Sequence, residues 1–82
     1  MAAAGISMHP ACRVRREGFG LLFYDLRGPR LLFAETGDLI PVDFFDAPRG
    51  TDEFPAGVTE RQKPMLRTLF ARLITKGFLR EQ

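Results

Sequence analysis

The stretch FGLLFYDLRGPRLLFAE, residues 19–35, constrains the fold most, because it places two strongly apolar runs on either side of a short charged turn. The first run, residues 21–26, is rich in the aromatic and large apolar side chains typical of β-strands. Gly28 allows positive φ and Pro29 has no amide hydrogen for a ladder, so residues 27–30 form a turn. Residues 31–35 are the return strand, and the two runs predict a β-hairpin.

The segments around this hairpin predict one more strand and two helices. Residues 12–17, CRVRRE, alternate imperfectly and indicate a weaker strand. Thr36 or Asp38 is a candidate N-cap for a short helix over residues 37–46. Residues 47–57 carry several Pro and Gly residues together with the acidic pair Asp52 and Glu53, which predicts a loop.

A longer helix is expected over residues 60–76. Thr59 is its candidate N-cap, and Gln62 stands three residues later as the capping-box partner. Gly77 is expected to end the helix as a C′ residue. Apolar residues recur along it at helical period: Met65, Leu66, Leu69, Phe70, Leu73 and Ile74. The predicted fold class is therefore α+β, a winged helix-turn-helix-like domain in which a three-stranded antiparallel sheet is followed by two or three helices.

Length and composition indicate one small domain. The chain has 82 residues, 45% of them hydrophobic, and eight Phe, which suffice for a small core. We expect residues 1–10 to be a flexible N-terminal tail and residues 11–82 to form a single domain. The start lacks the features of a signal peptide and no run is long enough to span a membrane, so the expectation is a soluble cytoplasmic protein.

The residues that carry most enzyme chemistry are scarce. His9 and Cys12 are the only histidine and cysteine, and no acidic residue stands near them in the sequence to orient them. A cation site could be suggested by four carboxylates, Asp43, Asp46, Asp52 and Glu53, but Pro48, Gly50 and Pro55 interrupt this segment, which favours a solvated acidic loop. No glycine-rich phosphate loop is present. The prediction is a protein that is not an enzyme and that has no cofactor and no metal of its own.

Two modes of binding fit the pattern. Residues 57–82 carry six basic and two acidic residues, so the long helix of a winged-helix protein could enter the DNA major groove. Its basic residues are spaced out, however, and lack the Asn, Gln or Ser that often accompany Arg in base readout. The other mode is peptide binding by strand addition at residues 30–35, where Leu31, Leu32 and Phe33 leave few charges to protect an edge. Such an edge could also pair with itself in a homodimer.

The segment VRREGFGLLFYDLRGPRLLFAETGDL, residues 14–39, resembles the mycofactocin biosynthesis chaperones of the PqqD-like family of peptide-recognition domains, also called RiPP recognition elements. The matching features are Arg15-x-x-x-Phe19-Gly20, the Leu-Leu-Phe-Tyr strand, the Arg-Leu-x-Phe return strand and the Asp-Leu that follows. The C-terminal TERQKPMLRTLFARLITKGFL resembles the last helix of that family. In residues 47–58, where the family has a middle helix, this chain has a loop broken by Pro and Gly.

The resemblance implies a non-catalytic chaperone. It would bind the leader of the mycofactocin precursor peptide beside the third strand, in a groove made with the last helix. It would then present that peptide to a radical SAM maturase, which would hold the iron–sulfur cluster and SAM. No nucleic acid and no membrane is then expected as a partner. The peptide-binding residues that we predict are Arg30, Leu31, Leu32, Phe33 and Ala34 on the docking strand, and Met65, Arg67, Thr68, Ala71, Arg72 and Thr75 on the helix, with arginines meeting peptide carboxylates.

Overall fold

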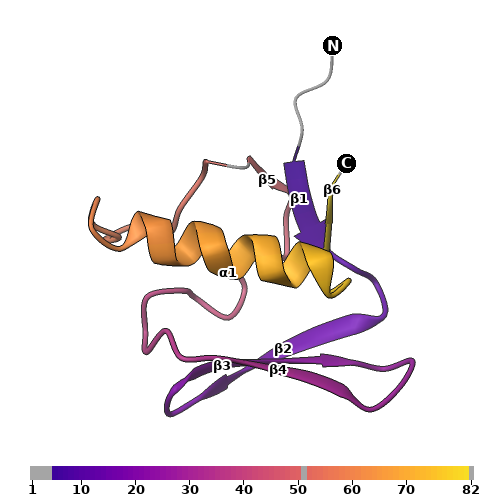
Figure 1. The fold of residues 1–82 in the computed structure, drawn as a ribbon. Helices are drawn as coiled ribbons and strands as arrows, with labels where there is room; N and C mark the ends of the chain where they lie inside the picture. Colours follow the sequence, from indigo (N-terminus) through magenta and orange to yellow (C-terminus); the bar gives the residue numbers. More distant parts are fainter. Residues whose placement is uncertain (1–4, 51, 82) are drawn as a thin grey trace.

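The computed structural model describes residues 5–50 and 52–81, which form two small antiparallel sheets and one helix (Figure 1). The fold class is α+β, as predicted, but the described residues contain one α-helix where two or three were expected. The elements in chain order are β1 (Gly5–Met8), β2 (Cys12–Glu17), β3 (Gly20–Asp25), β4 (Arg30–Ala34), β5 (Arg49–Gly50), α1 (Lys63–Thr75) and β6 (Leu79–Glu81).

The predicted hairpin is confirmed, with strand ends within one residue of the expected positions. β3 is the central strand of a sheet with the order β2-β3-β4, and both pairs are antiparallel. Phe23 lies opposite Val14 on one side and Leu32 on the other. Phe23 is fully buried and Leu32 is nearly so, because this face of the sheet packs on the core. The weaker strand over residues 12–17 is confirmed with the expected bounds.

A second sheet, with the order β5-β1-β6, contains residues that the sequence analysis assigned to the tail. Residues 1–4 of that segment lie outside the described residues. Residues 5–8 form β1, which pairs with β6 so that Ser7 lies opposite Arg80. The Ile6 side chain is 1% exposed, so burial of this side chain together with the β6 ladder explains why the strand forms. In Figure 1 this sheet lies on the far side of α1 from the β2-β3-β4 sheet.

The prediction of a short helix over residues 37–46 is wrong, because the segment consists of turns and bends. The amides of Leu39 and Phe44 each donate three residues back, to Thr36 and Pro41. Pro41 has no amide to donate and disfavours helical backbone at the residue before it. The guanidinium of Arg16 also donates to the carbonyl of Ile40 at 2.5 Å, and thereby satisfies an oxygen that a helix would have used.

α1 begins at Lys63, three residues later than expected, and ends at Thr75, one residue before the expected end. The Gln62 side chain accepts a hydrogen bond from the Thr59 amide at 2.9 Å, which is one half of the predicted capping box. The N-cap of α1 is Gln62 and not the predicted Thr59, and the Gln62 side chain makes no cap hydrogen bond within the described residues. Gly77 has a φ of 86°, and the Phe78 amide donates to the Leu73 carbonyl at 2.9 Å. This is the Schellman arrangement expected of a C′ glycine.

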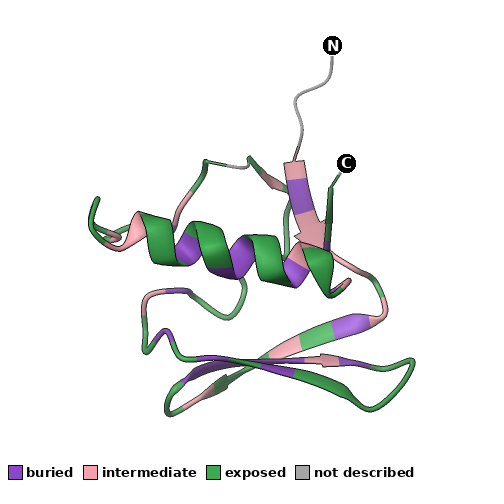
Figure 2. Ribbon diagram, in the orientation of Figure 1, coloured by how far each residue is buried: buried purple, intermediate pink, exposed green. Residues whose placement is uncertain are grey.

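The core lies between the inner face of the β2-β3-β4 sheet and the apolar face of α1 (Figures 1 and 2). Four α1 residues at helical spacing are buried: Leu66, Leu69, Phe70 and Leu73. Aromatic residues of the turns between residues 37 and 46 fill the layer between the sheet and the helix. The Phe45 ring is tilted against that of Phe23, with centroids 6.4 Å apart, and meets that of Phe70 edge-on, with centroids 5.4 Å apart. Over the described residues, no helix has the length and apolar character required to cross a membrane.

Candidate functional site

β4 is the edge strand of its sheet, and among the described residues its only partner strand is β3. Residues along it alternate between burial and exposure: Leu32 and Ala34 are 6% and 2% exposed, whereas Leu31 and Phe33 are 59% and 60% exposed. Alternation of this kind is expected of a strand with one face on the core. Two large apolar side chains are therefore left in solvent next to an unpaired strand edge.

The direction of the β4 main-chain groups follows from the neighbouring strands. Successive residues of a strand present their N–H and C=O groups to opposite sides. The amide of Leu26, directly after β3, donates to the Ala11 carbonyl at 2.8 Å, on the β2 side. The main-chain N–H and C=O groups of the odd-numbered β3 residues therefore point toward β4. One of these residues, Phe23, is directly opposite Leu32. We infer that the main-chain groups of Leu32 form hydrogen bonds with β3.

A glycine contact supports the same assignment. A Cβ added to Gly20 would lie 2.2 Å from the Ala34 carbonyl oxygen, so this oxygen points toward β3. Because Leu32 and Ala34 face β3, Leu31 and Phe33 present their N–H and C=O groups to the open edge. The same two residues thus offer both main-chain hydrogen-bonding groups and exposed apolar side chains.

Two adjoining hollows lie between β4 and α1, and we call them together the β4–α1 groove. The Phe78 hollow has a volume of about 560 Å³ and is lined by Pro29, Arg30, Leu31, Leu32, Phe33, Arg72, Lys76 and Phe78. The Met65 hollow has a volume of about 290 Å³ and is lined by Phe33, Ala34, Glu35, Thr36, Met65, Thr68, Leu69 and Arg72. Phe33 and Arg72 line both hollows, so the groove follows β4 continuously from Pro29 to Thr36.

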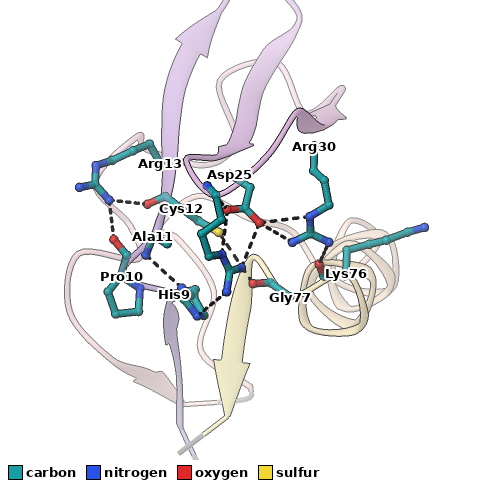
Figure 3. Close-up of polar contacts among 10 residues, drawn as sticks. His9, Pro10, Ala11, Cys12, Arg13, Asp25, Arg30, Lys76 and Gly77 are labelled. Atoms are coloured by element: carbon teal, nitrogen blue, oxygen red, sulfur yellow. Dashed lines mark hydrogen bonds and ion pairs between the residues drawn. The ribbon is translucent and has the colours of Figure 1, made fainter.

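Arg30 holds one end of this groove together (Figure 3). Its guanidinium donates to Oδ2 of the buried Asp25 at 2.7 Å and to the carbonyl of Lys76, at the end of α1, at 2.5 Å. It also lies over the Phe78 ring, 5.0 Å from the centroid. Hydrogen bonds from the Arg27 side chain and amide, and then from Arg30, lower the pKa of Asp25 well below its ordinary range. Arg30 therefore serves the fold, and its charge is already compensated.

Arg72 and Lys76 are the two groove cations without such compensation. Both are exposed, and neither side chain has a hydrogen bond or ion pair within residues 5–50 and 52–81. They stand four residues apart on α1 and line the same hollow. Most other basic residues of the chain differ: Lys63, for example, pairs with Glu60 at 2.6 Å, and Arg49 with Glu53 at 2.8 Å.

The structure brings eight of the eleven predicted peptide-binding residues to the groove. These are all five of the β4 set together with Met65, Thr68 and Arg72. Arg67 and Ala71 lie elsewhere on α1, beside Ile6 and Phe70, and Thr75 lines neither hollow. Within β4, Leu32 and Ala34 contribute their side chains to the core, so only Leu31 and Phe33 offer side chains to a partner.

Sequence reasoning missed several groove residues. Lys76, Phe78 and Leu69 line the groove but are not among the predicted peptide-binding residues. The signal for Lys76 was its position four residues after Arg72, which places both side chains on one face of a helix. Phe78 carried no such signal, because its place beneath Arg30 depends on the Schellman turn.

His9 and Cys12, the two residues considered for catalysis, each form a hydrogen bond with the backbone. Nδ1 of His9 accepts from the Ala11 amide at 3.0 Å, and burial and the nearby Arg27 lower the pKa of this imidazole. The Cys12 thiol is buried and faces the Gly77 carbonyl, and burial raises its pKa, which disfavours a nucleophilic thiolate. In the part of the chain that the structure describes, no group of three or more His, Cys, Asp or Glu residues could hold a metal ion.

Comparisons of the chain with the models of known protein families, with curated proteins and with solved structures found no match.

Proposed function

We propose that this protein is a non-catalytic peptide chaperone, a RiPP recognition element. It binds the leader of the mycofactocin precursor peptide by β-strand addition to β4 and presents the peptide to a radical SAM maturase. The observation that carries the proposal is the open edge of β4, where Leu31 and Phe33 present free main-chain groups beside the groove formed with α1. Main-chain pairing would supply affinity, and the groove would supply specificity.

The composition of β4 supports use of this edge by another chain. Proteins usually protect an exposed edge with Lys, Pro, a bulge or an inward-pointing charge. β4 has none of these between Leu31 and Ala34, and the charge at its start, Arg30, is committed to Asp25. An unprotected edge with two large exposed apolar residues risks aggregation unless pairing is its purpose.

The choice of this peptide and this maturase rests on the resemblance of residues 14–39 to the PqqD-like family. In this proposal the β2-β3-β4 sheet is the strand layer of a reduced winged-helix-like domain, and α1 corresponds to its last helix. Residues 47–50 and 52–58 form turns, loop and the two-residue strand β5, in the part of the chain where that family has a middle helix. The iron–sulfur cluster and SAM would belong to the maturase, since Cys12 is the single cysteine of this chain.

Calorimetric titration with the precursor peptide, and separately with duplex DNA, at low and high salt tests the proposal. We expect the peptide to bind with moderate affinity, because it must become ordered on binding, and with limited salt dependence. Binding of DNA that falls steeply with salt, without binding of the peptide, would instead favour a winged-helix DNA-binding protein that uses the basic C-terminal helix. Sedimentation of the protein alone reports whether the edge self-pairs into a homodimer.

A further inference from the structure

We infer that the β4–α1 groove selects a peptide with a carboxylate side chain facing Arg72 and Lys76 and an apolar side chain entering the Met65 hollow. This inference rests on the proposed function, since it assumes that an extended peptide pairs with β4. It adds what the peptide must contain and where each side chain lies along β4.

The carboxylate requirement follows from the two groove cations. Like charges four residues apart on a helix repel each other. Arg72 and Lys76 have that spacing, and within the described residues no acidic side chain pairs with either. Arg30 is no alternative partner, because Asp25 already holds it at 2.7 Å. A carboxylate between the two cations would relieve their repulsion and form charge-assisted hydrogen bonds.

The apolar requirement follows from the Met65 hollow. Its lining includes the apolar residues Phe33, Ala34, Met65 and Leu69, and Met65 is 46% exposed. The flexible thioether of Met65 can adapt to apolar side chains of different shapes. Glu35 stands at the same end of the groove, so a second peptide carboxylate would be disfavoured at this position.

The two requirements together set a register. The Phe78 hollow adjoins the beginning of β4 and the Met65 hollow adjoins its end. Side chains on one side of an added strand are two or four residues apart. The acidic and apolar residues of the peptide should therefore be separated by one or three residues, with the acidic residue at the Arg30 end of β4.

Fluorescence anisotropy with three short synthetic peptides tests this selection. Each peptide is extended and rich in threonine and valine, with leucine at the apolar position. The acidic position carries glutamate, glutamine or lysine. At low salt we expect the glutamate peptide to bind roughly fivefold or more tightly than the glutamine peptide, and the lysine peptide to bind most weakly.

Protein variants then assign the preference to the two cations. Arg72→Gln with Lys76→Gln should remove the preference for glutamate, and Arg72→Glu should shift it toward lysine. The matched control is Arg61→Gln with Arg80→Gln, which removes the same charge from residues that line neither hollow and should keep the preference. A preference that survives in the double groove variant, or disappears equally in the control, would overturn the inference.

The outcomes also separate the inference from the proposed function. If the glutamate and glutamine peptides bind wild type equally well and both bind Leu31→Pro poorly, the inference fails and strand addition stands. If neither these peptides nor the precursor leader bind wild type, strand addition fails and the inference fails with it.

Discussion

Oδ2 of Asp25 lies 2.7 Å from Nη2 of Arg30, and this ion pair connects the end of the central strand to the beginning of the edge strand. The same guanidinium donates to the Lys76 carbonyl at the end of α1. One side chain thus links both sides of the groove, and Asp25, whose side chain is buried, orients it. The ionised Asp25 carboxylate thus fixes the side chain that joins β4 to the end of α1.

Replacement of this carboxylate should change how stability depends on pH. The hydrogen bonds from Arg27 and Arg30 hold the pKa of Asp25 below its ordinary value of 3.8. A lowered carboxyl pKa adds stability that is complete above the unfolded-state pKa, about 4, and is lost as the pH falls toward the folded-state value. Asp25→Asn should therefore lower the urea midpoint at pH 7, and its deficit relative to wild type should shrink as the pH falls below about 4.

The matched control for this prediction is Asp38→Asn, which removes an exposed carboxylate. It should follow the wild-type profile over the same pH series. The lowered pKa values of Glu53 and Glu60 act in the same direction in all three proteins, so they do not produce the difference. Wild-type and Asp25→Asn curves that stay parallel from pH 7 to pH 3 would contradict the assignment.

Proline substitutions along β4 should alternate in effect. Leu31→Pro and Phe33→Pro remove amides that face the open edge, so the fold should persist, as it does for proline on edge strands. Each lost hydrogen bond should weaken binding of the precursor peptide roughly fivefold or more. Leu32→Pro removes an amide that faces β3 and should unfold the sheet. Circular dichroism measures folding, and calorimetry measures binding.

Alanine variants at the same positions control for the loss of side chains. Leu31→Ala keeps the edge amide, so it should bind the peptide more tightly than Leu31→Pro. Leu32→Ala keeps the ladder amide, so it should be destabilised mainly by the loss of a buried side chain, about 2–5 kcal/mol. Equal binding by the Leu31 proline and alanine variants would argue against main-chain pairing at this edge.

Gly20 should not tolerate a side chain. Its φ is 146°, and an added Cβ would lie 2.2 Å from the Ala34 carbonyl oxygen and 2.6 Å from the Thr36 nitrogen. Both contacts are to backbone, so relief requires the end of β4 to move away from β3. We expect Gly20→Ala to lower the free energy of unfolding by at least about 2 kcal/mol in denaturant titrations.

Gly28→Ala provides the comparison in the neighbouring turn. An added Cβ there meets no atom within 4 Å, so the change should be within about 0.5–1 kcal/mol of wild type and of either sign. Similar losses for Gly20→Ala and Gly28→Ala would mean that the close approach of β4 to Gly20 does not limit stability.

Thr36→Val should stabilise the protein. The Thr36 hydroxyl is buried, and in the described part of the chain its oxygen has no hydrogen-bond partner. Valine has nearly the same shape and no polar atom to desolvate, so we expect a gain of about 1 kcal/mol in the free energy of unfolding. Thr68→Val, which loses an exposed hydrogen bond to the Pro64 carbonyl, should be neutral or slightly destabilising. Destabilisation by Thr36→Val would indicate that the hydroxyl is satisfied in solution.

The elements that the sequence predicted well are those set by local patterns. Apolar residues with strand character on either side of Gly28 and Pro29 specify the hairpin, because its pairing joins residues close in sequence. The helical apolar stripe ending at Gly77 specifies α1 in the same way. The open edge of β4 was also foreseeable, since its uncharged apolar run lacks the usual protection against pairing.

The errors have a common origin in contacts between distant residues. A four-residue strand such as β1 carries too little periodicity to be distinguished from a tail, and it exists because residues over seventy positions away form β6. In residues 37–46, turns use backbone groups that a helix would have paired. Arg16 of β2 also donates to the carbonyls of Gly37 and Ile40. Neither partner can be inferred from the segment itself.

By itself, the sequence determined the hairpin, the apolar face of α1 and the position on β4 of the residues predicted to dock a peptide, because strand and helix periods fix which side chains share a face. Only the tertiary structure decided what each of those residues does. It buries the Leu32 side chain, exposes Leu31 and Phe33 at the edge and pairs Arg30 with Asp25. It also places Arg72 and Lys76 in one hollow, where neither has an ion pair with another described residue. The physical reason is that strand register and charge pairing are properties of packed neighbours, which the order of residues along one segment does not contain.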